Sequence, residues 1–333
     1  MSELRTVLVT GATGFVGGHV CGALLQRGVA VRGAVWSDGL APAPGVEPVS
    51  LRDLADREGL RRALAGVDAV VHLAARVHIM DDREANPLQA YRSVNVQGTG
   101  AVLEEAIAAG VGRFVLFSSV KAVGESSDVP LTEATAPAPV DPYGISKLEA
   151  EVLVRRLATA HGVHAPILRL PLCYGPGMKG NMLRLFSVVD RGLPLPLGGI
   201  SNHRSLVFVG NVADAVLSVL ETAEAATETF FVSDGQDLST PDLVRAIARS
   251  LGRRARLVPV PPFVFRLAGR AGDMAARFRP MGVSSAAVDR LLGSLTVDSS
   301  KLTRVTGLRP RHRVEDGLGA TAAWFRASRQ PRP

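Results

Sequence analysis

Residues 10–17 read Thr10-Gly-Ala-Thr-Gly-Phe-Val-Gly17, with glycines at positions 11, 14 and 17. The apolar run before them, residues 6–10, predicts a β-strand, and residues 17–27 predict a helix. In such a strand–turn–helix, glycine permits a tight turn, close approach of a pyrophosphate and packing of helix on sheet. The free N–H groups where the helix begins favour phosphate. We therefore expect a dinucleotide to contact Gly11, Thr13, Gly14, Phe15, Val16 and Gly17.

The alternation of strand and helix continues through the first half of the chain. Strands are predicted at residues 29–36, 69–73, 113–118 and 165–170, with helices at residues 56–65, 88–109 and 143–161. Continuous apolar strands joined by helical crossovers are typical of a parallel sheet covered on both faces. The expected fold class is α/β, a Rossmann-type doubly wound parallel sheet with a smaller α/β substrate lobe.

After residue 170 the chain becomes rich in proline and glycine, as in Pro171-Leu-Cys-Tyr-Gly-Pro-Gly177. Such loop-rich segments suit a lobe that closes over a ligand. A strand at 206–209 and a helix at 212–223 indicate one return to the first domain. We predict a dinucleotide-binding domain (1–170 and 205–227), a substrate lobe (171–204 and 228–325) and a disordered tail (326–333).

The composition excludes several classes of protein. Apolar residues make up 47% and charged residues 21% of the chain, as in soluble globular proteins. The net charge of +7 comes from 34 arginines and only four lysines, without the basic runs of a nucleic-acid surface. The arginines are better suited to single contacts with an anionic ligand. Cys21 and Cys173 have no metal-ligand spacing, so we expect no metal and two reduced thiols of a cytosolic protein.

Two segments bear on membrane contact. Residues 6–26 carry no Asp, Glu, Lys or Arg, which is enough length to cross a bilayer, but they contain five glycines. The neutral start Met1-Ser-Glu-Leu-Arg5 also lacks the basic region of a signal peptide. We predict no transmembrane segment and a cytoplasmic location. Residues 263–278 are apolar with interspersed arginines and suit a membrane surface or a helix packed on the core, and we favour the core helix.

The sequence Tyr143-Gly-Ile-Ser-Lys147 separates a phenol and an ammonium by four residues, which places them one turn apart on one helix face. A lysine charge beside a tyrosine favours the phenolate and lowers the tyrosine pKa, producing a usable acid/base. Ser119 adds a hydroxyl at the end of a predicted strand. Ser119, Tyr143 and Lys147 are therefore the candidate catalytic residues.

These motifs resemble the extended short-chain dehydrogenase/reductases, a family of nucleotide-sugar epimerases, dehydratases and ketoreductases, and the resemblance covers nearly the whole chain. It implies that Tyr143 exchanges a proton with the sugar, Lys147 binds the nicotinamide ribose and Ser119 holds the reacting oxygen, while the nicotinamide carries the hydride. A homodimer through the long helices is common in this family. The resemblance further implies cofactor contacts from Asp53, Leu54, Leu73, Ala74, Ala75, Asn95, Ser118 and Leu172. Asp53 as a loop carboxylate and Asn95 as a polar residue at a helix kink are the structural alternatives.

The second predicted strand bears on the choice of dinucleotide. NAD-selective sites usually place a carboxylate at the end of this strand, for the ribose 2′-hydroxyl. Here the strand ends Ala34-Val-Trp-Ser-Asp38, with no carboxylate before Asp38. Ser37 is placed to hold a 2′-phosphate. We expect NADP or NAD, with a slight preference for NADP.

The residues after Ser119 bear on the reaction. In the family's 4,6-dehydratases the catalytic Thr is followed by Asp-Glu, whereas Val120 and Lys121 follow here. Many 4-epimerases carry an Asn where this chain has Leu172. Several phrases, Ser118-Ser-Val-Lys121 among them, resemble bacterial 4-ketoreductases. We predict 4-keto reduction of a UDP-4-keto-6-deoxy-N-acetylhexosamine for surface polysaccharide synthesis.

Two alternative functions remain. One is a UDP-sugar 4-epimerase of the UDP-glucose or UDP-GlcNAc type. The other is a non-catalytic NAD(P)-sensing Rossmann protein, although such relatives typically lose the Tyr–Lys pair. The nucleotide sugar is the expected partner of the enzyme, with predicted contacts from Ser119, Lys121, Asn181 and Arg204. The resemblance implies the contacts of Asn181 and Arg204 with the diphosphate, and an arginine fork suits phosphate.

Overall fold

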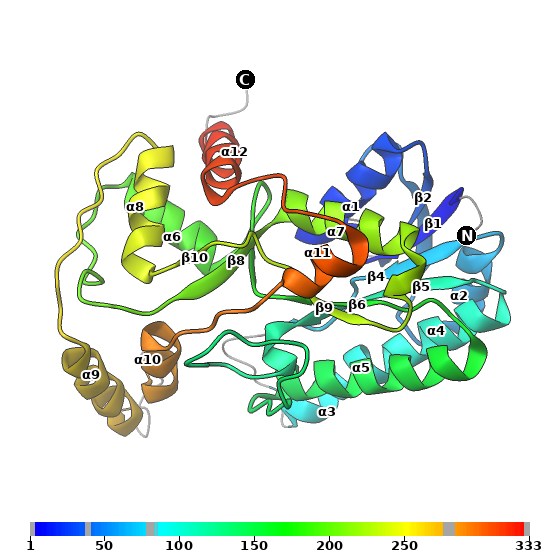
Figure 1. Ribbon diagram of the computed structural model, residues 1–333, viewed down its shortest axis with the longest axis horizontal. Coiled ribbons are helices and arrows are strands. Elements are labelled where there is room, and N and C mark those ends of the chain that lie inside the picture. The colour runs from blue at the N-terminus through cyan, green and yellow to red at the C-terminus, as the bar shows by residue number, and fades with distance from the viewer. Residues whose placement is uncertain (1–3, 37–40, 78–83, 85, 276–283, 330–333) are drawn as a thin grey trace.

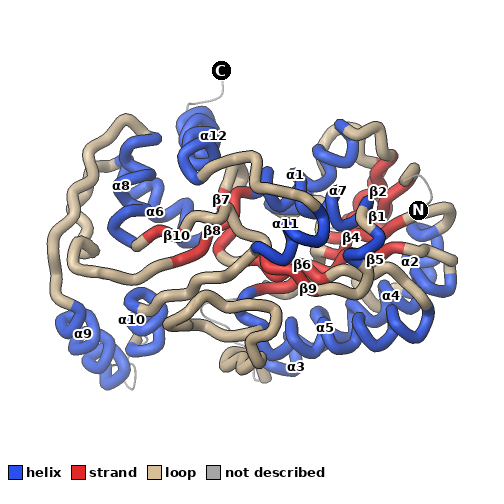
Figure 2. The backbone as a smooth tube through the Cα atoms, viewed as in Figure 1, coloured by secondary structure: helices blue, strands red, loops and turns tan. Residues whose placement is uncertain are grey.

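A computed structural model describes residues 4–36, 41–77, 84, 86–275 and 284–329 of the chain (Figure 1). Its main sheet has seven parallel strands in the order β3-β2-β1-β4-β5-β6-β9 (Figure 2). The chain winds outward from β1 to β3 and then returns to β4 on the other side of β1. The carboxyl ends of β1 and β4 are therefore the switch point where such sheets bind ligands. The strands are β1 (Thr6–Thr10), β2 (Ala30–Trp36), β3 (Glu47–Leu51), β4 (Ala69–His72), β5 (Arg113–Ser119), β6 (Ile167–Leu170) and β9 (Thr229–Phe231).

Helices cover both faces of this sheet (Figure 1). One face carries α1 (Phe15–Gln26), α7 (Val209–Glu221) and α11 (Ser300–Thr306), and the other carries α2 (Arg57–Leu64), α4 (Thr99–Ala108) and α5 (Pro142–His161). A separate apolar cluster fills each side of the sheet. The expected Rossmann-type α/β class is confirmed.

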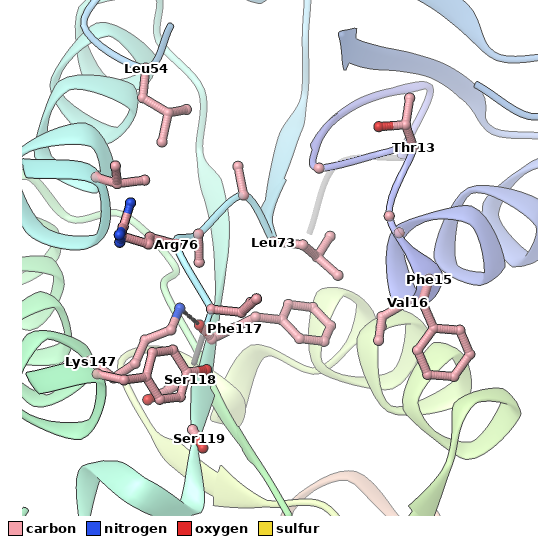
Figure 3. A pocket seen from close by; sticks show the side chains of 18 of the residues that line it. Thr13, Phe15, Val16, Leu54, Leu73, Arg76, Phe117, Ser118, Ser119 and Lys147 are labelled. Carbon is pink, nitrogen blue, oxygen red and sulfur yellow. Dashed lines mark hydrogen bonds between the residues drawn. The ribbon is translucent and has the colours of Figure 1, made fainter. Parts of the chain in front are cut away.

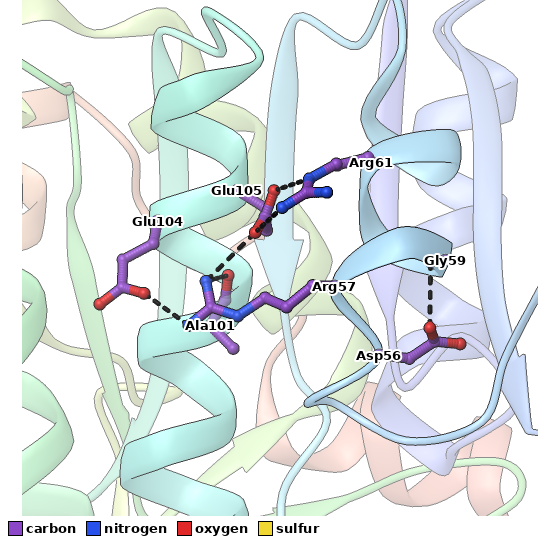
Figure 4. A network of polar contacts seen from close by, with 7 residues as sticks. All are labelled: Asp56, Arg57, Gly59, Arg61, Ala101, Glu104 and Glu105. Carbon is purple, nitrogen blue, oxygen red and sulfur yellow. Dashed lines mark hydrogen bonds and ion pairs between the residues drawn. The ribbon is translucent and has the colours of Figure 1, made fainter.

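One ion-pair network joins α2 to α4 on the second face (Figure 4). The buried carboxylate of Glu105 accepts hydrogen bonds from Arg61 at 2.9 Å and from Arg57 at 3.3 Å. The hydrogen bond from Arg61 is the largest of the effects that lower the pKa of Glu105. The network fastens α2, the helix that connects β3 to β4 along the chain, to α4.

The helix predicted at residues 88–109 has a break in its regular geometry. It consists of α3 (Pro87–Arg92), a π-helical stretch η1 (Ser93–Gly98) and then α4. Asn95 lies in the π-helical turn, and Gly98 contacts Leu54 so closely that a Cβ there would come within 2.8 Å. Hydrophobic periodicity does not distinguish such a turn from α-helix, and π-turns often occur at functional sites.

The second lobe is built on a three-stranded sheet, β10 (Asp237–Leu238), β8 (Arg204–Phe208) and β7 (Leu172–Tyr174). Because Pro171 has no N–H for a ladder bond, the chain leaves the main sheet between β6 and β7. A core of aromatic and aliphatic side chains joins this sheet to the lobe helices. These are α6 (Gly180–Asp190), α8 (Thr240–Ser250) and α12 (Val314–Ala327), with α9 (Pro262–Ala275) and α10 (Ser285–Leu292) at the outer edge (Figure 1).

Three features differ from the sequence predictions. Strand β8 pairs with β7 and not with the main sheet, whereas β9, which was assigned to the substrate lobe, pairs with β6. The predicted disordered tail includes the end of α12, and Arg329 donates hydrogen bonds to Asp190 at 3.0 Å and Ser187 at 3.1 Å. Residues 330–333 lie outside the described part. None of the described helices has the length and hydropathy needed to span a bilayer.

Candidate active site

A cavity of about 880 Å³ opens at the carboxyl ends of β1, β4 and β5 (Figure 3). The glycine turn borders one side, and the end of β5 with the start of α5 borders the other. Predicted site residues make up much of its lining: Gly11, Thr13, Gly14, Phe15, Val16, Gly17, Asp53, Leu54, Leu73, Ala74, Ala75, Ser118, Ser119, Tyr143 and Lys147. The fold therefore brings the predicted cofactor turn and the predicted catalytic residues into one cleft.

The turn between β1 and α1 has no space for side chains at its glycines. Gly11 has a φ of +73°, and a Cβ added at Gly17 would lie 2.1 Å from the Gly11 carbonyl oxygen. No side chain caps α1 at Gly14, and its first turn contains no acidic residue. The free N–H groups at the start of α1 can therefore donate hydrogen bonds to an anion. The turn and the cavity fit the pyrophosphate of a dinucleotide.

The loop after β4 is held by buried polar contacts. His72 lies between the hydroxyls of Thr10 at 2.8 Å and Thr99 at 2.9 Å. Burial, with a smaller effect of the Lys147 charge, lowers the pKa of His72 to about 3, so the ring is neutral. These contacts tie β1, β4 and α4 together beneath the cavity.

Asn95 supports the cavity wall without lining it. Its side chain accepts a hydrogen bond from the Arg76 N–H at 2.8 Å and donates to the Arg76 carbonyl at 3.0 Å. It also donates to Ser146 on α5 at 2.9 Å. These contacts fit the structural alternative given above, in which Asn95 is a polar residue at a helix kink.

Tyr143, Lys147 and Ser119 converge at the bottom of the cleft. Ser119 and Tyr143 both line the cleft, and the Lys147 ammonium donates to the Phe117 carbonyl at 2.8 Å (Figure 3). Burial raises the pKa of Tyr143 to about 12, although the Ser119 hydroxyl opposes this, and burial lowers the pKa of Lys147 to about 8. The predicted lowering of the tyrosine pKa is therefore wrong, because burial of the phenol raises this pKa and Lys147 is not among the groups that oppose the rise.

A buried ion pair lies directly behind these residues. Ser118 donates to Glu151 at 2.5 Å, and Arg169 contacts both oxygens of the same carboxylate, at 3.0 and 2.7 Å. Glu151 follows Lys147 by one helical turn on α5. The network therefore fastens the end of β5 to the helix that carries Tyr143 and Lys147.

Several predicted contacts lie away from the cavity. Lys121 forms ion pairs with Glu125 at 2.8 Å and Asp141 at 2.5 Å, so its ammonium is engaged by carboxylates. Arg204 donates to the backbone carbonyls of Arg290 and Gly293 at the end of α10. Asn181, at the start of α6, and Leu172 are exposed and do not line the cavity. Ser37 lies outside the described residues.

Some lining residues were not predicted from the sequence. Most lie next to predicted positions or at strand ends, which is the signal that could have identified them. Arg76, for example, follows Ala75 directly and lies over the Tyr91 ring at 5.3 Å from its centroid. The additional lining residues are Trp36, Arg52, Ala55, Arg76, Val77, Ser93, Val94, Phe117, Leu170, Pro171 and Cys173.

The charge distribution of the lining bears on the chemistry. Among the described residues, Asp53 is the one carboxylate that lines the cavity, and its oxygen accepts from the Ala55 N–H at 2.7 Å. The acid/base groups at the bottom of the cleft are Tyr143 and Lys147. The site can therefore move one proton at a substrate oxygen beside a bound dinucleotide, without a carboxylate pair for elimination of water.

Comparison with known proteins gives a consistent result. Residues 7–232 match the model of the NAD dependent epimerase/dehydratase family. The chain is 37% identical over 330 residues to a UDP-glucose 4-epimerase of Vibrio cholerae, covering 96% of this chain and 95% of that protein. It is 28% identical to an N-acetyl-alpha-D-glucosaminyl-diphospho-ditrans,octacis-undecaprenol 4-epimerase of Escherichia coli O157:H7, covering 95% and 93% of the two chains.

Solved structures show the same fold. A UDP-glucose 4-epimerase of Thermus thermophilus in complex with NAD superposes with a TM-score of 0.76 at 26% identity, covering 97% of this chain and 100% of that one. A MoeE5 structure with UDP-glucuronic acid and NAD has a TM-score of 0.76 at 26% identity, covering 97% and 99%. These NAD complexes give no support to the preference for NADP. On its sequence and its fold, the chain belongs to the NAD-dependent epimerase/dehydratase family of extended short-chain dehydrogenase/reductases and is an enzyme of the nucleotide-sugar epimerase/dehydratase type.

Proposed function

We propose that this enzyme is an NAD-dependent 4-epimerase of UDP-linked hexoses, with UDP-glucose and UDP-GlcNAc as the first substrates to test. The observation that supports this best is the convergence of Ser119, Tyr143 and Lys147 on a cleft whose described lining contains no carboxylate pair. The full-length similarity to the Vibrio cholerae UDP-glucose 4-epimerase supports the choice of epimerisation over the 4-keto reduction that the sequence motifs favoured.

Tyr143, Ser119 and Lys147 would each have a separate role in this reaction. Bound NAD would supply the hydride acceptor, and as NADH the hydride donor, for oxidation and reduction at C4 of the sugar. Tyr143 would accept the proton of the 4-hydroxyl and later return it, and Ser119, which lines the same cleft, would hold the same oxygen. The Lys147 ammonium lies one helical turn away, where its charge favours a phenolate once it is released from the Phe117 carbonyl.

The cofactor would lie along the glycine turn, with its pyrophosphate at the start of α1 and its adenosine toward Trp36, Asp53 and Leu54. Arg32, a potential partner of a 2′-phosphate, points away from this region, since its guanidinium donates to the carbonyls of Ala63 and Ala65. This orientation supports NAD. The sugar nucleotide would lie between the end of β5 and the second lobe.

The test is direct. Purified enzyme with NAD should interconvert UDP-glucose with UDP-galactose, or UDP-GlcNAc with UDP-GalNAc, without net change in cofactor absorbance at the wavelength of NADH. Tyr143→Phe should lose about 10²-fold or more in turnover because it removes one positioned acid/base. Tyr91→Phe is the matched control, since its ring centroid lies 6.0 Å from that of Tyr143 and its hydroxyl donates to the Val77 carbonyl.

A 4-ketoreductase is the second candidate, favoured by Leu172 at the position where many 4-epimerases carry an Asn. Its side chain is exposed and contributes no amide to the cavity. Oxidation of NADH or NADPH in the presence of a UDP-4-keto-6-deoxy-N-acetylhexosamine, with no interconversion of the UDP-sugar pairs, would establish the reductase instead. Failure of both reactions with unaltered NAD binding would favour the non-catalytic alternative.

A further inference from the structure

Helix α9 lies beside α10 at the outer edge of the second lobe (Figure 1). Gly269 and Gly272 are its buried residues and lie three positions apart, on the same side of the helix. A Cβ at Gly269 would come within 3.0 Å of the Ser285 Cα and 3.1 Å of a Val288 methyl. Gly269 therefore lets α9 pack closely against α10.

The opposite face of α9 is apolar and exposed. Phe263, Leu267 and Met274 are 67%, 65% and 69% exposed. At 3.6 residues per turn these three side chains fall within an arc of about 40°, roughly opposite the buried glycines. The expectation of a helix packed on the core is therefore wrong for this face, which presents exposed apolar side chains to the surroundings, while residues 276–278 of the predicted segment lie outside the described part of the chain.

Charged side chains of one sign border the stripe. Arg266 and Arg270 are both exposed and lie along the same edge of it. The one acidic residue in α9, Asp273, is turned toward α10, where its carboxylate accepts from the Ser285 N–H at 3.2 Å. The outward face thus combines apolar side chains with two arginines that form no ion pair within the described part of the chain, a combination typical of helices that lie in the surface of an anionic bilayer.

We propose that α9 docks the enzyme on an anionic phospholipid surface, with Phe263, Leu267 and Met274 in the acyl boundary and the two arginines at the headgroups. A second copy of this chain is a poorer occupant, because a twofold contact sets the same patch against itself and brings the arginines together. The surface is independent of the proposed epimerase chemistry, since no residue of α9 lines the cleft.

The experiment is co-sedimentation of the full chain with sucrose-loaded vesicles of phosphatidylcholine alone or of phosphatidylcholine with phosphatidylglycerol at 3:1. The wild type should bind the anionic vesicles, and added salt should weaken this binding. The pair Phe263→Ser and Leu267→Ser, and separately the pair Arg266→Gln and Arg270→Gln, should each lower the partition coefficient by about tenfold or more.

The matched control is the pair Val129→Ser and Val140→Ser, which removes apolar side chains of similar exposure, 68% and 73%, from loops elsewhere. This control should bind vesicles like the wild type, and all variants should keep wild-type NAD binding. Absence of binding to anionic vesicles, or equal loss in the control, would overturn the proposal. So would dissociation of a dimer by the Phe263 and Leu267 changes with unaltered vesicle binding, which would assign the face to a second copy.

Discussion

Replacement of Glu151 by Gln should destabilise the protein far more than the same change at Glu149, two residues earlier on α5. Both glutamates pair with an arginine through short contacts. Glu151 and Arg169 are 1% and 5% exposed, whereas Glu149 and Arg92 are 34% and 41% exposed. The two variants delete the same charge from one helix and differ in the solvation of the arginine that remains.

The magnitude follows from burial. In Glu151→Gln the guanidinium of Arg169 stays buried against the Phe231 ring with no opposing charge, which typically costs about 3–5 kcal/mol. A half-exposed pair such as Glu149–Arg92 contributes about 0–1 kcal/mol. With a change of about 2–4 °C in Tm per kcal/mol for a domain of 150–250 residues, the expected losses are roughly 6–20 °C for Glu151→Gln and below about 4 °C for Glu149→Gln.

Thermal unfolding followed by circular dichroism at one scan rate measures the difference. Joint replacement of Glu151 and Arg169 by methionine should recover most of the lost Tm, because removal of a whole buried pair is often close to neutral. Equal losses for Glu151→Gln and Glu149→Gln would refute the reasoning. A double variant less stable than Glu151→Gln would show that the ion pair itself stabilises the fold.

Four further outcomes are expected. Gly17→Ala should weaken NAD binding by about tenfold or more in a fluorescence titration, because its Cβ would lie 2.1 Å from the Gly11 carbonyl oxygen, and unaltered affinity would contradict the tight turn. The difference in tyrosinate absorbance at 295 nm between wild type and Tyr143→Phe should stay near zero until about pH 11, since burial raises the pKa of Tyr143 to about 12; titration near pH 10 would contradict this. Asp141→Ala should cost about 1 kcal/mol in urea unfolding, because it removes the 2.6 Å bond that caps α5 at the Gly144 N–H, whereas Asp141→Asn should keep the cap. The pKa of Glu105 is lowered in the folded state, so its ionised form stabilises the protein above the unfolded pKa, and this stability is lost as the pH falls through the folded pKa. The difference in unfolding free energy between wild type and Glu105→Gln should therefore shrink on acidification from pH 7 to 3. A constant difference would contradict this prediction.

Much of the architecture can be predicted from local pattern. The apolar run before Gly11 and the glycine spacing after it predict a strand, a tight turn and a helix, and all three are present. The spacing of Tyr143 and Lys147 predicts one helix face, and both line the cavity. These features are readable because they depend on steric limits and helical periodicity within a few residues of the chain.

Features that depend on distant neighbours could not be read in this way. Strand β8 was assigned to the dinucleotide-binding domain, yet it pairs with β7 in the smaller sheet, and nothing in its own residues selects that partner. Arg204 was predicted to bind phosphate, yet its guanidinium donates to carbonyls at the end of α10, nearly ninety residues later in the chain. Strand pairing and side-chain partners depend on residues far apart in the chain, which come into contact only in the folded structure.

The chemistry of the site also depends partly on local sequence and partly on the tertiary structure. The identity of the acid/base pair, Tyr143 and Lys147, is a property of their types and spacing. The direction of the Tyr143 pKa shift is not, because it depends mainly on how completely the packed chain removes water from the phenol. Local sequence specifies which groups are available for chemistry, whereas desolvation, which exists only in the assembled fold, sets the energy of their charged forms.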